Sequence, residues 1–297
     1  MKVRKRNGNL EELDIRKTQK MSIASCVDLD GVNSSELEVD AHIKLIDGMS
    51  TTDINDALIR TAVEKIDIDK PNWTFVGARL FVFDLYHKVG RAVGGTKGNA
   101  YCHFNHYLKV GKDAGRLIAN LGEGFDLEDL NNYIKPERDM LFNYLGIKTL
   151  YDRYLIKNHF GEPIELPQQM FMAIAIFLAQ DEEDKQNKAK DFYDVISKFE
   201  VMLATPTLSN ARTNRHQLSS CYIGSTPDNI EGIFGSFKEM GLLSKFGGGI
   251  GWDWNLIRSL GGIIDGHKNA AGGVVPQLKI VNDIALAYDQ LGYLNAA

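Results

Sequence analysis

Apolar residues recur at helical spacing through most of the first two hundred positions. In one stretch they stand four residues apart, at Ile54, Leu58, Ala62 and Ile66. That spacing predicts an amphipathic helix with one apolar stripe, and Pro71 begins another segment of the same kind. Residues 101–199 continue this pattern, with the charged run 181–190 as a solvated helix end or loop. The chain is therefore predicted to be mostly helical.

The first residues of the chain predict a β-hairpin. Short strand candidates at 2–6 and 10–13 flank Asn7-Gly8, a dipeptide that supplies the positive φ angles of a tight turn. Asp14 follows directly and can cap a helix that runs toward Cys26.

Two more helices are expected before residue 66. Ser35 and Glu38 have capping-box spacing ahead of a helix that ends at residues 47–48. The next helix begins near Thr52 and contains the apolar stripe described above. The opening module is thus a hairpin followed by helices.

The pattern changes after residue 200, where short strands are predicted at 201–204 and 219–223. Glycines crowd positions 247–251, and Pro276 precedes another helical pattern through Asp289. This part is therefore expected to be mixed α/β.

Glycines at positions 94–98 mark the clearest linker of the chain. Together with the change near residue 200, this linker divides the sequence into predicted domains at 1–95, 96–200 and 201–297. No internal repeat or low-complexity tract interrupts them. The predicted fold class is mixed α/β with a high helical content.

Composition narrows the function classes. The formal charge of −5 and pI near 5.8 provide no general basic field, so nucleic acid is not an expected partner. The most apolar stretch, 170–179, is far shorter than a membrane span. The sequence has only three cysteines, which is a small and odd number and argues against a disulfide scaffold. A cytoplasmic protein that does not associate with membranes is expected.

Three features could support chemistry. Lys5 and Arg6 flank the hairpin turn, which suits either a nucleotide phosphate or an ordinary charged surface. The glycines at 247–251 lack the endings of a P-loop and of a dinucleotide fingerprint. They either admit a phosphate or sugar close to the backbone or serve as a packing turn. Cys221 is either a reactive thiol or a buried inert one.

Strand alternation assigns the neighbours of Cys221 to two faces. Ser219 and Ile223 are expected to share its face, whereas Ser220 and Tyr222 point to the other side. Elsewhere Cys102, His103 and His106 have metal-like spacing, but a closed zinc site needs four ligands and no fourth stands nearby. No metal site is therefore predicted.

Residues 204–210 read Ala-Thr-Pro-Thr-Leu-Ser-Asn and are followed by Ser219-Ser220-Cys221. This ordered combination resembles the substrate region of the large, catalytic subunit of class I ribonucleotide reductases. The resemblance continues through residues 228–230, 247–251, 257–261 and 282–292, and looks closest to the versions of large tailed phages. Residues 3–8 and 14–17 resemble the ATP-cone, a regulatory domain at the start of many such subunits.

The resemblance implies a fold and a set of site residues. The fold would be an ATP-cone of hairpin and helices, a helical domain, and the first part of a ten-stranded α/β barrel. Cys221 would be one of two cysteines that supply reducing electrons, and Thr205, Ser220 and Gly249 would line the substrate pocket. The effector specificity site would consist of Asp228, Asn229, Ile230 and Arg258. The activity site of the ATP-cone would consist of Lys5, Glu11, Glu12, Leu13, Asp14, Ile15, Arg16, Lys17, Thr51 and His87. His87 stands where the family has a lysine, and Lys88 follows it.

The resemblance also implies components that these residues do not provide. Reduction by a thiol pair needs two sulfurs close enough to join, and no cysteine follows Cys221. The leading hypothesis is a split or truncated large subunit, inactive alone, completed by a complementary C-terminal fragment with the radical cysteine. The alternatives are a non-catalytic nucleotide-sensing fragment, an inactive remnant, or a piece of a longer protein.

The expected ligands and partners follow from the same resemblance. No cofactor would be bound covalently. ATP and deoxynucleotides would act as effectors, and the small radical-generating subunit would supply the radical and its metal. A second large subunit would form a dimer, and thioredoxin or glutaredoxin would act as reductant.

Overall fold

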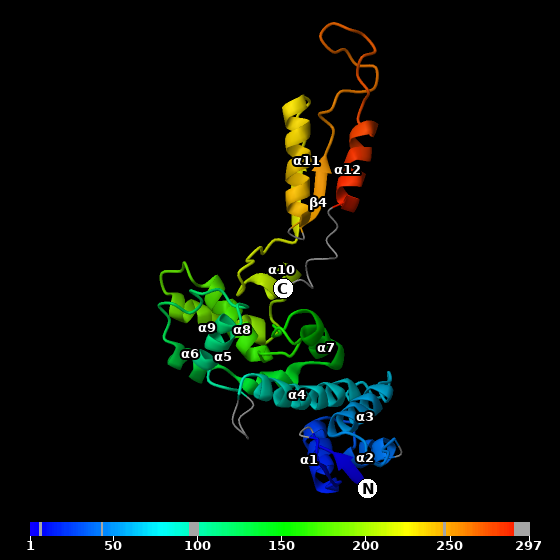
Figure 1. Cartoon of the computed structure of the whole chain (residues 1–297), viewed down its shortest axis with the longest axis vertical. Coiled ribbons are helices and arrows are strands. Elements are labelled where there is room, and N and C mark those ends of the chain that lie inside the picture. The colour runs from blue at the N-terminus through cyan, green and yellow to red at the C-terminus, as the bar shows by residue number, and fades with distance from the viewer. Residues whose placement is uncertain (6–7, 43, 95–100, 246–247, 288–297) are drawn as a thin grey trace. The chain divides into compact units, whose positions relative to one another are not determined.

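Residues 1–5, 8–42, 44–94, 101–245 and 248–287 are described by the computed structural model drawn in Figure 1. The chain forms two compact units. The first contains residues 1–202 and 212–214, and the second contains residues 203–211 and 215–297. The chain as a whole is mostly helical, and its second unit also contains two strands, as the sequence predicts.

The first unit opens with the predicted hairpin. Strands β1 (Lys2–Arg4) and β2 (Leu10–Glu12) are antiparallel, with Val3 opposite Glu11. Gly8 has a φ of +88°, which glycine adopts without steric cost. Asn7, the other predicted turn residue, lies outside the described residues.

Three helices complete this module. Helix α1 (Ile15–Cys26) begins where predicted, because the side chain of Asp14 accepts a hydrogen bond from the backbone N–H of Arg16 at 3.2 Å. Helix α3 (Thr51–Glu64) begins with a capping box between Ser50 and Asp53. Helix α2 (Ser34–His42) lies between them in the sequence.

The prediction for α2 is wrong at both ends. Asn33, not Ser35, accepts the hydrogen bond at its start, from the backbone N–H of Ser35 at 2.8 Å. Ser35 is already inside the helix and therefore cannot cap it. The helix also ends at His42, well before the predicted end at 47–48.

Helix α4 (Trp73–Ala92) is long and joins two layers of the first unit. It packs against α3 on one side and against α7 (Tyr144–Arg153) on another, as Figure 1 shows. Val76 and Leu80 of this helix, which belong to the apolar segment predicted after Pro71, are fully buried. The predicted linker at 94–98 lies outside the described residues beyond Gly94.

The remaining helices of the first unit include one that is apolar and buried, α8 (Pro167–Leu178). The others are α5 (Phe104–Asp113), α6 (Leu127–Tyr133), the 3-10 helix η1 (Pro136–Leu141) and α9 (Lys185–Ser197). Every residue of α8 from Pro167 to Ile176 is buried. A helix that is apolar on all sides belongs in a core, and α9 and η1 pack against this one.

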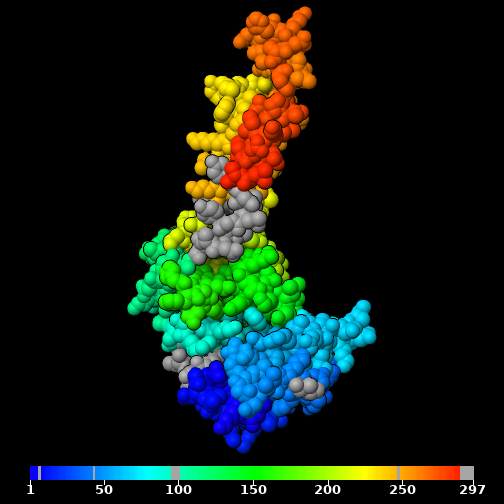
Figure 2. Space-filling view, turned by 45° about the vertical axis from the view of Figure 1, so that its right-hand side comes forward, coloured from blue at the N-terminus to red at the C-terminus, as the bar shows by residue number. Residues whose placement is uncertain are grey.

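The second unit has one βαβ arrangement. Its elements are α10 (Thr205–Asn210), β3 (Cys221–Ser225), α11 (Ile230–Lys245), β4 (Gly249–Asp253) and α12 (Val275–Ala287). Strands β3 and β4 are parallel neighbours connected through α11. No residue of α12 is buried, and this helix lies at the surface, red in Figure 2.

Two details correct or explain the sequence reading of this unit. The predicted strand at 201–204 does not form, because Ala204 is the cap of α10 and Pro206 favours the start of a helix. In β3, a Cβ atom on Gly224 would lie 2.3 Å from the ring of Trp252. Glycine therefore lets the indole pack flat against the strand.

Among the described residues, no helix combines the length and the apolar character needed to cross a membrane.

Candidate functional site

The first candidate site is a cavity of about 480 Å³ in the first unit. The hairpin, α1, α3 and the end of α4 all contribute to its wall. The lining residues are Val3, Lys5, Leu13, Asp14, Lys17, Thr18, Lys20, Met21, Thr51, Ile54, Asn55 and His87. Segments far apart in the sequence thus meet around one space large enough for a small organic ligand.

Six residues that the sequence assigns to an ATP-cone site line this cavity together. They are Lys5, Leu13, Asp14, Lys17, Thr51 and His87. Glu11, Glu12, Ile15 and Arg16 are not among the lining residues. Glu11 still contacts the site indirectly, because its carboxylate lies 3.6 Å from the ammonium group of Lys5.

The other six lining residues were not predicted from the sequence. Thr18 and Met21 lie one helical turn after Asp14 and Lys17, and Ile54 and Asn55 lie one turn after Thr51. Residues three and four apart share a helix face, so this spacing could have identified them. Val3 is the buried residue of β1, and strand alternation would have indicated it.

The cavity wall has a positive local charge, although the whole chain is acidic. Lys5, Lys17 and Lys20 line it, against one carboxylate from Asp14. The apolar lining residues are Val3, Leu13, Met21 and Ile54. Ammonium groups beside such apolar side chains suit a ligand with a phosphate and a flat ring.

Lys88 does not take the place of the missing lysine at His87. Lys88 is not among the lining residues, and its ammonium group lies 2.8 Å from the carboxylate of the buried Asp84. His87 is therefore the residue that α4 presents to the cavity.

The second candidate site surrounds Cys221 at the start of β3. Cys221 is exposed, so the interpretation of a buried thiol is wrong, whereas its reactivity stays a prediction. Ile223 is 91% exposed, whereas Tyr222 is half-buried, which is the predicted alternation. The hydroxyl of Ser220 lies 3.6 Å from the sulfur of Cys221.

Gly249 of β4 lies directly beside Cys221 of β3. The two residues are partners in the parallel register, and the N–H of Gly249 donates to the carbonyl of Ser220 at 2.7 Å. A Cβ atom on Gly249 would lie 3.1 Å from that carbonyl oxygen and 3.8 Å from the sulfur. The glycine therefore keeps the backbone beside the thiol unobstructed.

Helix α10 is tied to the segment that leads into Cys221. The hydroxyl of Thr207 donates to the carbonyl of Leu218 at 3.2 Å, and the side-chain amide of Asn210 donates to the carbonyl of Gln217 at 3.0 Å. Thr205, the predicted substrate residue, is the first residue of this helix and is exposed.

All three cysteines have free thiols. Cys26 and Cys102 belong to the first unit, and burial raises the pKa of each thiol. Cys221 is the cysteine of the second unit. This sequence therefore offers no second thiol within the unit that contains Cys221.

The third candidate site joins Asp228 and Arg258. The guanidinium Nε lies 2.7 Å from the Asp228 carboxylate, and Nη2 donates to the Asp228 carbonyl at 3.2 Å. The side chain of Asn229 accepts from the N–H of Gly232 at 2.8 Å and so caps α11. Ile230 is 62% exposed. These four predicted residues thus lie together at the start of α11.

No group of metal-ligating side chains occurs among the residues that the structure describes. His103 contacts Glu128 at 2.7 Å, and His106 contacts the carbonyl of Val93 at 2.8 Å.

Comparison with protein families identifies the class of this protein. Residues 1–88 match the ATP cone domain, residues 140–216 the all-alpha domain of ribonucleotide reductase, and residues 219–297 its barrel domain. The chain belongs to the ribonucleotide reductase large-subunit family.

Individual relatives agree with this class. The chain is 60% identical over 288 residues to ribonucleoside-diphosphate reductase subunit alpha of Helicobacter pylori strain ATCC 700392 / 26695, covering 97% of this chain and 36% of that protein. It is 38% identical to the Treponema pallidum subunit alpha over 79% of this chain and 28% of that protein. The Synechocystis subunit alpha is 33% identical, over 98% of this chain and 37% of that protein. The chain thus spans about a third of the length of these relatives.

Proposed function

We propose that this chain is the amino-terminal portion of a class I ribonucleotide reductase large subunit and acts in the reduction of ribonucleoside diphosphates to deoxyribonucleotides. The main support is the order of the three matched domains, together with the grouping of Ser220, Cys221 and Gly249 at the start of a parallel strand pair. Thr205, Ser220 and Gly249 would contact the substrate.

The proposed chemistry assigns Cys221 to a redox pair. Two thiols together give up two electrons and two protons and become a disulfide. The ribose 2′-hydroxyl leaves as water, and a hydrogen takes its place on the carbon. The exposed sulfur of Cys221, beside a glycine, suits a thiol that must meet both a substrate and a second sulfur.

The second sulfur and the radical cysteine would come from a C-terminal portion that completes the barrel. The described part of the second unit supports this assembly, because it leaves large apolar side chains exposed on both strands and helices. Examples are Ile223 at 91%, Phe234 at 63% and Leu286 at 72% exposure. Such an apolar surface on a small unit is typical of an interface.

Effectors would bind at the other two sites. ATP or a deoxynucleotide would occupy the cavity of the first unit, with its phosphates near Lys5 and Lys17 and its hydroxyls within reach of Thr51. A second effector would bind at Asp228 and Arg258, because a carboxylate suits ribose hydroxyls and a guanidinium suits phosphate. This effector would have to compete with the present ion pair between them.

The remaining partners of the proposed enzyme are a second large subunit, the small subunit with its radical and metal, and thioredoxin or glutaredoxin. Cytoplasmic location follows from the same proposal, since the reductants act there.

A second function is favoured by one observation, namely that the whole lining of the first cavity lies within residues 3–87. A nucleotide-sensing role needs no reducing thiols. The chain would then bind ATP without contributing to reduction.

The deciding experiment is affinity purification of the chain from its native host, followed by a ribonucleotide reduction assay. We expect a copurifying chain with the missing cysteines and activity that Cys221→Ser abolishes, with nucleotide binding retained. A lone, inactive chain that still binds ATP would support the sensing role instead. Undiminished turnover of the serine variant would remove Cys221 from the mechanism.

A further inference from the structure

Asp139 is a buried carboxylate at the meeting point of several elements of the first unit. It lies in η1 and is 1% exposed. The hydroxyls of Tyr86 and Tyr101 donate to its Oδ2 at 2.8 and 2.5 Å, and the amide of Gln168 donates to its Oδ1 at 2.9 Å. Tyr86 comes from α4 and Gln168 from α8, so the carboxylate connects two helices through η1.

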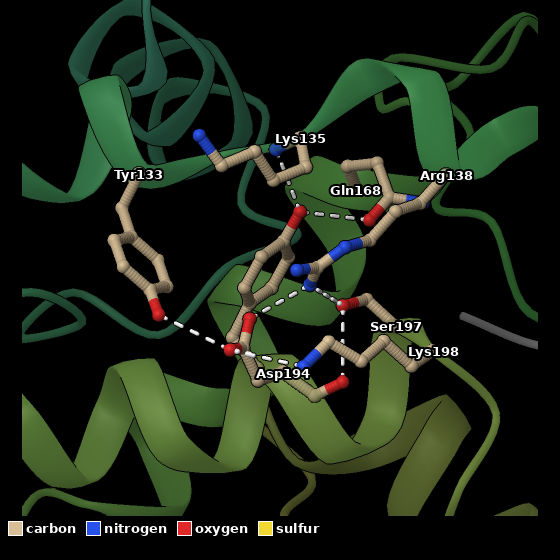
Figure 3. A network of polar contacts seen from close by, with 8 residues as sticks. Tyr133, Lys135, Arg138, Gln168, Asp194, Ser197 and Lys198 are labelled. Carbon is tan, nitrogen blue, oxygen red and sulfur yellow. Dashed lines mark hydrogen bonds and ion pairs between the residues drawn. The ribbon is translucent and has the colours of Figure 1, made fainter.

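The network continues beyond Gln168. Its Oε1 accepts from the hydroxyl of Tyr193 in α9 at 2.8 Å, and that hydroxyl oxygen accepts from the backbone N–H of Lys135 at 2.8 Å (Figure 3). Buried polar networks of this kind hold their members in one arrangement, because each unpaired group would be costly.

Helix α4 connects this network to the first cavity. Tyr86 and His87 are consecutive, and successive residues of a helix point about 100° apart. His87 lines the cavity, whereas Tyr86 donates to Asp139. One helical turn therefore contacts the candidate nucleotide site on one side and the helical core on the other.

The charge state of Asp139 decides how many donors it can hold. A carboxylate only accepts, so it can satisfy Tyr86, Tyr101 and Gln168 together. A protonated carboxyl must itself donate, which displaces one of them. The groups that face it are Tyr86, Tyr101, Gln168, Tyr193 and Glu137. Burial raises the pKa of Asp139 to about 6.

We propose that Asp139 is a positioning residue that couples the nucleotide cavity to the helical core, by holding Tyr86 of α4 in a network with α8 and α9. The coupling rests on the proposed binding of ATP in that cavity. A contiguous network alone does not establish coupling, so the test measures the response of one end to a ligand at the other.

The test is hydrogen–deuterium exchange of the full chain with and without ATP, with ATP affinity measured by calorimetry. Peptides covering 135–141 and 167–178 report on η1 and α8. In the wild type, ATP is expected to slow exchange in these peptides several-fold. In Tyr86→Phe, ATP affinity should stay within about threefold while the response of both peptides is lost, because only a hydroxyl outside the cavity is removed.

Tyr133→Phe is the matched control. Its hydroxyl also donates to a carboxylate, that of Asp194 at 3.1 Å, and Asp194 has no contact with α4 among the described interactions (Figure 3). This variant should respond like the wild type. Asp139→Asn should behave like Tyr86→Phe, and the wild-type response should weaken between pH 7.5 and pH 5.5.

The outcomes separate the two proposals. Absence of ATP binding to the wild type would overturn the proposed cavity function, and the coupling with it. Binding without any response in the two peptides, or an unchanged response in Tyr86→Phe, would overturn the coupling alone. If Tyr133→Phe also lost the response, the effect of Tyr86→Phe would reflect a general loosening of the core, which would likewise overturn the coupling.

Discussion

At the scale of single residues, the surroundings of Cys221 depend on Gly249, which has no side chain. Gly249 lies beside the sulfur and donates its N–H to Ser220. The space that a Cβ atom would take at this position is bounded by a carbonyl oxygen, which cannot move without shifting β3. We therefore expect the accessibility of the thiol to depend on one glycine of the neighbouring strand.

Gly249→Ala should slow alkylation of Cys221 by about twofold or more, because the new methyl group shields one side of the sulfur. Iodoacetamide labelling followed by mass spectrometry of the Cys221 peptide measures this. Gly251→Ala is the control, since its Cβ atom would lie 3.9 Å from the nearest atom, an ordinary contact. Equal rates in both variants would contradict the proposed shielding.

The family resemblance, rather than residue types or spacing, supplied the predicted site residues, and their roles stay predictions. Six of ten predicted cone residues line one cavity, and Ser220, Cys221 and Gly249 lie together. The ion pair between Asp228 and Arg258 could not be predicted, because neither spacing nor composition indicates which charges meet in space. The buried position of Asp139 could not be predicted for the same reason, since its three donors, Tyr86, Tyr101 and Gln168, come from three separate segments.

At the scale of elements, helix starts show where sequence patterns succeed and where they fail. Ser50 and Ser35 both precede an acidic residue by three positions. Only Ser50 caps a helix, with its hydroxyl accepting from the N–H of Asp53 at 3.0 Å, whereas Asn33 caps α2. The same local pattern occurs inside a helix when a better cap stands just upstream, and local spacing cannot rank the two.

This difference gives a matched pair of variants. Ser50→Ala should destabilise the first unit by about 1 kcal/mol, the usual cost of removing a side-chain cap. Ser35→Ala should change stability by less than about 0.5 kcal/mol, because its hydroxyl does not cap. Urea unfolding followed by circular dichroism measures the free energy of unfolding of both variants. Equal decreases would contradict a stabilising cap at Ser50.

Strand predictions were less reliable than helix predictions. The segment 201–204 is apolar like a strand, but no strand of the described residues pairs with it, and helix α10 begins directly after it at Thr205. Parallel strands pair through distant residues, so their partners depend on the whole fold. The pairing of β3 with β4 could be expected from the family resemblance rather than from alternation.

At the scale of the whole molecule, the two units should respond differently to a nucleotide. A ligand that binds only the folded state adds about 2.7 kcal/mol of stability at a concentration of one hundred times its dissociation constant. The cavity of the first unit lies entirely within that unit. Its occupation should therefore stabilise the first unit without a direct effect on the second.

Differential scanning calorimetry of the chain with increasing ATP checks this expectation. The transition of the first unit should move to higher temperature, and Lys17→Ala should reduce the shift because it removes a cation from the cavity wall. Lys188→Ala, a surface lysine of α9 that is not among the lining residues, is the control. If ATP raised the transition temperature equally in Lys17→Ala and Lys188→Ala, ATP would bind outside this cavity.

The pairing of Cys221 with Gly249 also bears on how the chain folds. It closes a loop of about thirty residues, the size of one βαβ unit, so little chain entropy is lost before the contact forms. Low contact order favours fast folding, whereas distant parallel strands pair slowly. We therefore expect β3, α11 and β4 to assemble early during synthesis and to serve as the nucleus on which later strands of a barrel add.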